Sequence, residues 1–425
     1  MAAPTKRSLL VLVLVLLASW VVVSAVVLDS ETDNVEPSTE TESMEPDIET
    51  NGDTYDVGAN PEITAVESLP DGGYLVGGHV LTDGDRDAVV LRLAPNRSLE
   101  SVYTFGGDGD AGLSDLIQTS DGGFAFVGWR GDFHTSVGWI VNADANGDII
   151  SEKEFGSSTQ YADRMNALVA TDNDTIAAVG RTSQGVSNGT GAVLYELNAD
   201  GDVLLERVYR TGNNRSAKDI VQASNGEYLI VGTDDYQANS IPYQTDETPA
   251  AWFARVGTNG DLLWTTETQR GSRRGRVASD IVDAHGSGYV AVVVTAITSI
   301  GGGKGMALQR LDPQGEVVWT RDAEYTCSSG GSPLAEGTDG YALVRWICTD
   351  DSPKSDAIIE RWTTQGDLAW NLTFSDADEQ TLTAVTAQED GTFVAAGTAD
   401  EQIWLQTVTA TDRSNESNAL TNGYT

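Results

Sequence analysis

A short pattern that recurs seven times constrains the fold of this chain more than any other feature. Each copy is a polar tight turn followed by a large apolar residue, as in Asp71-Gly72-Gly73-Tyr74. The large residue stands at Tyr74, Phe124, Ile176, Tyr228, Tyr289, Tyr341 and Phe393. Successive copies are therefore separated by 50, 52, 52, 61, 52 and 52 residues. A nearly constant period of this length indicates a repeat architecture.

A second turn divides each unit further. It combines glycine with an acidic residue and then apolar residues, as in Asn146-Gly147-Asp148-Ile149. Each unit then contains four short β-rich runs, which in the first unit are residues 63–69, 74–80, 88–93 and 99–105. Four antiparallel strands per unit are typical of a propeller blade. The sequence therefore predicts an all-β fold, a seven-bladed β-propeller of four-stranded blades.

The two ends of the repeat region indicate how the ring closes. The last unit has no recognisable fourth strand after residues 402–409, whereas an unmatched strand-like piece, residues 54–58, precedes the first unit. We expect this N-terminal strand to complete the last blade, which removes open sheet edges. The propeller should then occupy residues 54–410 and be followed by a polar tail at 411–425.

The turns resemble the delta-sixty and pyrroloquinoline-quinone-like propeller repeats. The resemblance is carried by the Asp-Gly-Gly-aromatic turn, by the Phe-Gly-Gly-Asp-Gly run at 105–109, and by the later second turns that end in Trp264, Trp319 and Trp370. It implies that these tryptophans lock neighbouring blades together. Such repeats occur in exported proteins that are either enzymes or scaffolds, so the resemblance is specific for fold and not for activity.

The N-terminal region predicts export. Lys6 and Arg7 precede an uncharged, largely apolar run at residues 8–28, long enough to cross a bilayer as a helix. Residues 1–28 are therefore a signal peptide, cleaved after Ala25, or a membrane anchor. The following residues 29–53 hold ten carboxylates and no basic side chain. They are expected to form a disordered acidic linker.

The net charge of −39 excludes nucleic acid as a partner, since phosphate binding needs a basic surface. Only five of the 25 basic residues are lysines. At molar salt the screening length falls to ~3 Å, so self-repulsion nearly disappears. This composition predicts a halophilic protein, and acidic residues such as Asp83, Asp85, Asp87, Asp108 and Asp110 are then solvated surface.

Two covalent modifications are expected in an exported chain. Cys327 and Cys348 are the only cysteines and would form a disulfide. Asn-x-Ser/Thr sequons predict a glycoprotein. The candidate asparagines are Asn96, Asn173, Asn188, Asn214, Asn371 and Asn415.

The candidate binding residues lie in variable loops. Arg270, Arg273, Arg274 and Arg276 form the one basic cluster of the repeat region, and the insertion at 234–250 contributes Tyr236 and Tyr243. The arginines either bind a carboxylate or phosphate ligand or neutralise nearby carboxylates. Both segments belong to the kind of loop that varies between blades, where binding usually resides.

No metal or catalytic site is predicted. His79, His134 and His285 are too dispersed for a zinc site or a histidine-based catalytic machine. Residues 142–149 resemble the start of a calcium-binding loop, but Lys153 stands where a bidentate glutamate is needed. Neither calcium nor pyrroloquinoline quinone is therefore expected as a cofactor.

These observations favour a monomeric, non-catalytic binding or scaffold module, extracytoplasmic and either at the cell surface or secreted. A cell-envelope protein or a glycan would be its partner, and the membrane would be contacted through residues 8–28 if they are retained. The alternative is an enzyme with its site at the propeller channel, either a quinone-type oxidoreductase or a polysaccharide-acting enzyme.

Overall fold

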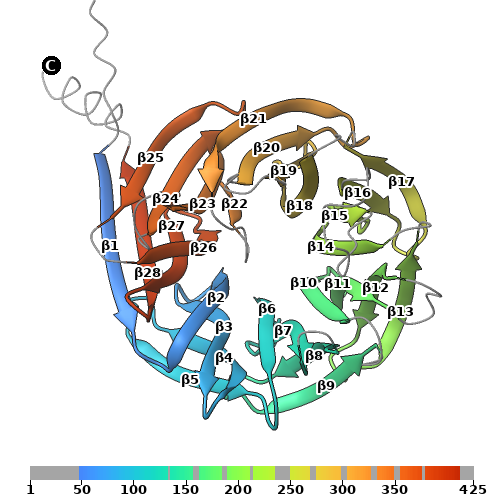
Figure 1. The fold of residues 1–425 in the computed structure, drawn as a ribbon, viewed down its shortest axis with the longest axis horizontal. Coiled ribbons are helices and arrows are strands. Elements are labelled where there is room, and N and C mark those ends of the chain that lie inside the picture. Colours follow the sequence, from blue (N-terminus) through green and yellow to red (C-terminus); the bar gives the residue numbers. More distant parts are fainter. Residues whose placement is uncertain are drawn as a thin grey trace, which may run out of the picture. The chain divides into compact units, whose positions relative to one another are not determined.

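The computed structural model describes residues 47–132, 135–156, 162–183, 189–210, 214–234, 249–268, 274–297, 304–326, 333–348, 355–375 and 379–411. Over these ranges the regular elements are all β-strands, which form seven four-stranded antiparallel sheets (Figure 1). The predicted seven-bladed propeller is confirmed. Within the same ranges there is no helix that could cross a membrane.

Each of the first six blades is made of four consecutive strands. Blades 1 and 2 comprise β2 (Ala59–Ser68), β3 (Tyr74–Thr82), β4 (Asp85–Leu93), β5 (Leu99–Phe105), β6 (Ala111–Gln118), β7 (Phe124–Arg130), β8 (Val137–Ala143) and β9 (Ile149–Phe155). Blades 3 and 4 comprise β10 (Arg164–Ala170), β11 (Ile176–Thr182), β12 (Gly191–Leu197), β13 (Val203–Tyr209), β14 (Arg215–Gln222), β15 (Tyr228–Asp234), β16 (Ala250–Val256) and β17 (Leu262–Glu267). Blades 5 and 6 comprise β18 (Arg274–Asp283), β19 (Tyr289–Ile297), β20 (Lys304–Leu311), β21 (Val317–Thr326), β22 (Leu334–Gly337), β23 (Gly340–Cys348), β24 (Ser355–Thr363) and β25 (Leu368–Phe374).

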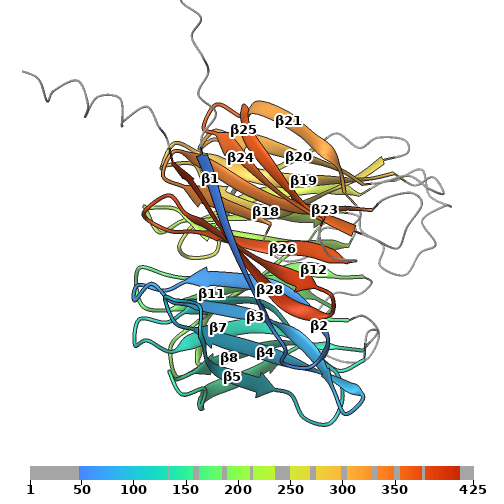
Figure 2. The same ribbon diagram turned by 90° about the vertical axis from the view of Figure 1, so that its left-hand side faces the viewer.

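Blade 7 joins the two ends of the described chain. It consists of β26 (Gln380–Ala387), β27 (Phe393–Ala399), β28 (Gln402–Thr411) and, as its outer strand, β1 (Asp47–Tyr55). β1 runs antiparallel to β28, with Tyr55 opposite Ile403 and Asp47 opposite Thr411, and lies along its whole length (Figure 2). The predicted closure by the N-terminal strand is confirmed.

The closing strand begins earlier than expected. Residues 47–53 were assigned to the disordered linker because they are almost entirely polar, yet they pair with β28. The reason is that an outer strand needs only its backbone hydrogen bonds and one inward-facing row of side chains. Ile48 packs on the apolar cluster between blades 6 and 7, while Asp53 forms an ion pair at 2.9 Å with Arg97 of blade 1.

The hydrophobic core is divided among the contacts between blades. Seven apolar clusters are found among the described residues, each formed by two neighbouring blades. Middle strands therefore read as continuous apolar runs, because neighbours cover both of their faces. Outer strands alternate or are exposed, as β9 shows.

The tryptophans of the second turn do pack between blades. The Trp264 ring lies against Gly315 of blade 5, and the Trp319 ring lies against Gly366 of blade 6. A Cβ atom on Gly315 would stand 2.6 Å from the Trp264 ring, and this glycine also has a φ of +83°. Only glycine satisfies both the close approach and the backbone conformation. The packing role implied by the repeat resemblance is confirmed for these two residues.

The antiparallel order of the strands gives the propeller two different faces. One face, here called the turn face, carries the glycine turns that join the first strand of a blade to the second and the third to the fourth. The opposite face, here called the loop face, carries the loops between second and third strands and the connections between blades. The innermost strands of neighbouring blades contact one another around the central channel (Figure 1).

Candidate functional site

The wall of the central channel is built from a repeated irregularity. In six blades the innermost strand contains a bulge, where one residue is inserted into its pairing with the second strand. The bulged residues are Thr64, Ser114, Asn166, Lys218, Ser279 and Thr383. A bulge re-aims a side chain and breaks the ladder locally, so these positions are free to serve purposes other than sheet pairing.

Three of the bulged side chains connect one blade to the next. Thr64 Oγ1 donates to the Leu113 carbonyl at 3.0 Å, and Thr383 Oγ1 donates to the Ile63 carbonyl at 2.6 Å. Asn166 Nδ2 donates to the carbonyl of Ala217 at 2.6 Å. Blades 1, 3 and 7 are thus each hydrogen-bonded to the following blade.

Blades 2, 4 and 5 use an aspartate one residue further on. Asp115, Asp219 and Asp280 each accept the N–H of the next residue in their own strand and an N–H from the following blade. The donors from the following blades are Leu168 at 3.1 Å, Ile281 at 2.7 Å and Leu334 at 2.8 Å. Each of these carboxyls therefore connects its blade to the following blade by a hydrogen bond along the channel.

Burial changes the protonation of these aspartates. It raises the pKa of Asp115 to about 8, and the nearby Asp219 charge adds to the effect. Asp219 and Asp280 hydrogen-bond to each other, and both have a raised pKa, mainly through burial. The Asp219 charge also opposes ionisation of Asp280.

Lys218 is the exception among the bulged residues. Its Nζ makes no hydrogen bond or ion pair within the described ranges, although it is half-buried in the channel wall. Burial, together with the charges of Arg181 and Arg164, lowers the pKa of Lys218 to about 8. The charges of these two arginines therefore oppose protonation of Lys218.

On the loop-face side of the bulges, paired residues form a row across blades 1 to 3. In each blade two of them stand opposite each other on the first and second strands: Glu62 with His79, Gly112 with Trp129, and Arg164 with Arg181. These pairs occupy the same register position, so ring closure brings them side by side at the channel mouth.

Side-chain contacts between neighbouring blades connect the paired residues of this row. The Arg164 guanidinium lies 4.6 Å from the Trp129 ring centroid, and His79 meets the edge of the same ring at a centroid distance of 6.4 Å. His79 Nε2 is 3.2 Å from Glu62 Oε2, and this hydrogen bond lowers the pKa of Glu62. Trp129 thus contacts both the Arg164 guanidinium and the imidazole of the Glu62–His79 pair.

A fourth cation completes the group. Arg86 is the second residue of β4 in blade 1 and is exposed. Its charge, with that of Arg181, adds to burial in lowering the pKa of Arg164 to about 10. We call Arg86, Arg164, Arg181 and Lys218 the cationic arc. Arg86 and Arg181 oppose the charge of Arg164, and Arg164 and Arg181 oppose that of Lys218, so cations gather here in a chain of net charge −39. Arginine binds carboxylates and phosphates in a bidentate geometry, so the arc is suited to an anion.

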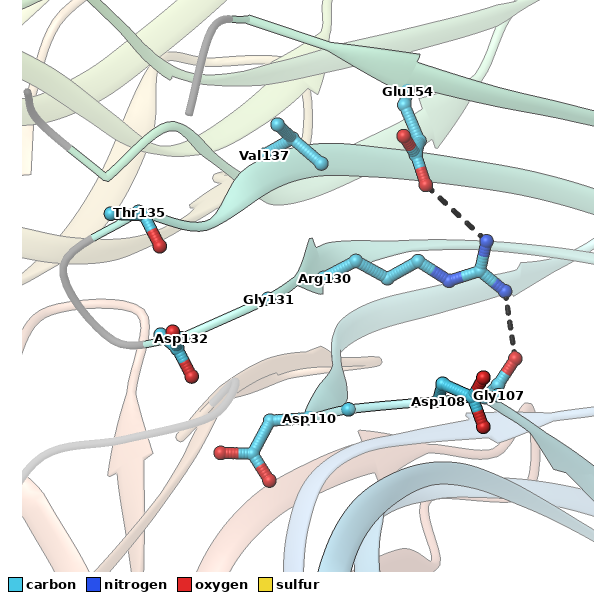
Figure 3. Close-up of a pocket in the computed structure, with 11 residues that line it drawn as sticks. Gly107, Asp108, Asp110, Arg130, Gly131, Asp132, Thr135, Val137 and Glu154 are labelled. Carbon is cyan, nitrogen blue, oxygen red and sulfur yellow. Dashed lines mark hydrogen bonds and ion pairs between the residues drawn. The ribbon is translucent and has the colours of Figure 1, made fainter. Parts of the chain in front are cut away.

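A pocket of about 590 Å³ lies on the loop face of blade 2 and has the opposite character. Its wall contains Asp108, Asp110, Asp132 and Glu154 (Figure 3). Arg130 crosses this pocket but is neutralised, at 2.8 Å by Glu152 and at 3.3 Å by Glu154, and it donates to the Gly106 carbonyl. The pocket is therefore not suited to an anion. Asp108 is exposed, whereas Asp110 is half-buried and accepts the N–H of Arg86 at 2.9 Å.

Several residues predicted from the sequence lie outside the described ranges. These are Tyr236, Tyr243, Arg270, Arg273, Cys327, His134, Asn188 and Asn415. Arg274 and Arg276 begin β18; Arg276 is exposed, and its N–H donates to the Pro249 carbonyl at 2.8 Å. The proposed arginine–tyrosine site and the disulfide of Cys348 therefore remain predictions.

The described sequons differ in accessibility. Asn96, Asn173 and Asn371 are exposed, whereas Asn214 is half-buried and its side chain accepts the N–H of Thr190 at 2.8 Å. Glycosylation at the three exposed asparagines remains a prediction. In the turn that resembles a calcium loop, Asp144 Oδ1 accepts the N–H groups of Asn146 and Asp148, which is a structural role.

Sequence reasoning missed the cationic arc, although one signal was available. Lys218 occupies the unit position where other blades have threonine, serine or asparagine, and it is one of five lysines in the chain. The three arginines give no such signal. They lie in separate segments and meet only when blades 1 and 3 are placed around the channel.

Comparison with known proteins supports the fold alone. No protein-family model matches the sequence, and no curated protein matches it. Among solved structures, the polysaccharide lyase Uly1 is similar with a TM-score of 0.52 and 9% identity, over 84% of this chain and 92% of that one. A puromycin hydrolase is similar with a TM-score of 0.50 and 13% identity, over 81% of this chain and 51% of that one. The chain thus spans about half the length of the puromycin hydrolase.

Proposed function

We propose that this protein is an extracytoplasmic binding module, at the cell surface or secreted and adapted to high salt, whose ligand is an anion held by the cationic arc. The convergence of Arg86, Arg164, Arg181 and Lys218 in so acidic a chain carries this proposal. The apolar run at 8–28 and the repeat resemblance support the extracytoplasmic location. A cell-envelope glycan with acidic sugars fits the same chemistry.

The arc is placed where a ligand can reach it. It lies on the loop-face side of the channel, and Arg86 is exposed while Lys218 is half-buried. An anion entering from the loop face would first meet Arg86 and then the more enclosed cations. Exclusion of water around the inner cations strengthens their interaction with an anion.

The binding experiment uses glucuronate as the probe, titrated calorimetrically in concentrated potassium chloride. The double variant R164Q/K218Q should weaken binding at least tenfold, because it removes two charges that face the ligand. The variant Arg276→Gln is the matched control, since it removes an exposed arginine outside the arc. Equal affinities for all three proteins, or no binding by the wild-type protein, would contradict the proposal.

A polysaccharide-acting enzyme is the second candidate. It is favoured by the Glu62–His79 pair, which borders the arc and places a carboxylate and an imidazole within hydrogen-bond distance. The similarity of fold to the polysaccharide lyase Uly1 agrees with this candidate. Incubation with polyglucuronate separates the two functions, because an enzyme produces new chain ends and a binding module leaves the polymer length unchanged.

A further inference from the structure

The outer strand of blade 6 presents an unpaired edge that differs from the edges of the other blades. β25 ends its sheet, with β24 on one side and no described strand on the other (Figure 1). Its residues, Leu-Ala-Trp-Asn-Leu-Thr-Phe, include no acidic or basic side chain. Each of the other outer strands, β1, β5, β9, β13, β17 and β21, carries at least one. An edge without charges lacks a usual protection against pairing with another strand.

The exposed row of side chains on β25 is polar but neutral. Its members in the regular part of the strand are Asn371 and Thr373. In blade 2 the same positions, counted from the bulge that follows the second turn, are occupied by Glu152 and Glu154. Like charges on directly opposite residues destabilise a strand pair, so β9 is protected against pairing with a copy of itself. β25 has no such protection.

The other row of β25 is apolar. Trp370, Leu372 and Phe374 are half-buried and pack on the cluster between blades 6 and 7. The bulge precedes Trp370, so regular pairing can extend from this residue to Phe374. Full antiparallel overlap of this stretch with a second copy places Leu372 opposite Leu372 and Trp370 opposite Phe374. The same register places Asn371 opposite Thr373, so each row meets a row of its own kind.

We propose that β25 is the interaction surface for a second copy of this chain, and that two propellers pair antiparallel through this edge so that two blades form one continuous sheet. The inference goes beyond the anion site, because the contact lies at the rim and leaves both channels open. It also departs from the monomer expected from the sequence. Chains of net charge −39 repel each other, so the pairing requires concentrated salt, where the screening length is ~3 Å.

Sedimentation equilibrium of the full chain in concentrated potassium chloride measures the pairing, with a non-ionic detergent for the apolar run at 8–28. The wild-type protein should have twice the mass of one chain. The double variant N371E/T373E should have the mass of a single chain, because it brings glutamates opposite each other. This variant reproduces the pattern of β9, which shows that a blade of this fold accepts glutamate at both positions.

The matched control is V102E/T104E. Val102 and Thr104 are exposed and occupy the same two positions in β5, the outer strand of blade 1. The control adds the same charge to the chain but leaves β25 unchanged, so it should still have twice the mass of one chain. Binding of glucuronate should be unaffected in both double variants, which keeps the test of the pairing separate from the test of the anion site.

Disulfide trapping tests the register. Directly opposite residues have Cα atoms about 4.5–5.5 Å apart, within the range of a disulfide, whereas diagonal neighbours are about 7–8 Å apart. Full chains carrying Asn371→Cys are mixed with full chains carrying Thr373→Cys and oxidised, and peptide mass spectrometry identifies the linked positions. The link from position 371 to position 373 should form at least tenfold faster than a link between two copies of either position.

Four outcomes would overturn the proposal. The first is a wild-type protein that has the mass of one chain in concentrated salt. The second is pairing that survives N371E/T373E or is lost equally in V102E/T104E, because the interface would then lie elsewhere or depend only on total charge. The third is a fast link between two copies of position 371. The fourth is a glycan on Asn371 of the native protein, because it would occupy the space of the second strand.

Discussion

At the scale of single residues, the channel wall shows how one repeated position can be divided between structure and function. The bulged residue and its successor form the connections between blades in most of the ring, through a hydroxyl, an amide or a carboxyl. In blade 4 the hydrogen bond from Ile281 to Asp219 already connects the blade to the next one, so the bulged position can be occupied by Lys218. The bulged position of blade 4 is therefore not required for the connection between blades and can carry a residue with a different role.

The buried Asp115 leads to a pH prediction. Its pKa is about 8 in the folded protein, against an ordinary value of 3.8. Between about pH 4 and pH 8 the folded state holds a proton that the unfolded chain has released, so the free energy of unfolding falls as pH rises through this window. Asp115→Asn should reduce the slope by up to ~1.4 kcal/mol per pH unit, the value for one proton.

Urea unfolding at constant salt and several pH values measures this slope. The variant also loses a carboxylate acceptor for the Leu168 N–H, which costs about 1–3 kcal/mol at low pH. Asp148→Asn is the control, because it removes an exposed carboxyl of the same charge. Parallel profiles for the wild-type protein and Asp115→Asn would show that Asp115 ionises normally.

At the scale of elements, β1 illustrates how little sequence information an outer strand needs. Its residues are mostly polar, yet it covers the edge of β28 and holds Tyr55 in the cluster between blades 7 and 1. The Tyr55 hydroxyl donates to the Arg97 carbonyl at 2.8 Å, which fastens the closing strand to blade 1. The closure therefore depends on backbone pairing and a few anchors.

Truncation tests the closure. A chain that begins at residue 47 should unfold at the same urea concentration as the full chain, whereas one that begins at residue 56 should unfold at a lower one. Burial of Tyr55 alone accounts for about 1.5–3 kcal/mol, and the lost pairing adds to it. The shorter chain should also associate through the exposed β28 edge, as seen by size-exclusion chromatography. Identical midpoints for both truncated chains would show that β1 does not close the ring.

At the scale of the whole molecule, charge is distributed unevenly. The net charge of −39 opposes compaction at low salt, while the cationic arc concentrates positive charge at one channel mouth. The glycine turns, by contrast, carry acidic side chains such as Asp121 and Asp144, whose pKa values are lowered by hydrogen bonds from the turn itself. The negative charge of these two residues thus also stabilises local structure.

Salt dependence is the prediction at this scale. Thermal stability should rise steeply as potassium chloride increases to about 1 M, where the screening length is ~3 Å and self-repulsion is nearly gone. Low concentrations of guanidinium chloride, which is itself a salt, should first stabilise the protein, whereas urea should only destabilise it. The measurement is a thermal melt in each solute. A stability that does not change with added salt would contradict the adaptation to high salt.

The sequence by itself determined the blades, their number and the way the ring closes. These features depend on local chemistry that repeats: glycine where a turn needs positive φ, and apolar runs where a strand is covered on both faces. The sequence did not predict that β1 begins at residue 47, because an outer strand can pair through its backbone without an apolar pattern in its side chains.

The tertiary structure alone decided the candidate site. Arg86, Arg164 and Lys218 belong to three different blades and lie far apart in sequence, and only Lys218 departs from the residue types at its repeat position. Their charges act on one another because ring closure brings strands of different blades to the same channel. The lowered pKa values of Arg164 and Lys218 arise from burial and from nearby cations, and neither condition exists until the ring has formed.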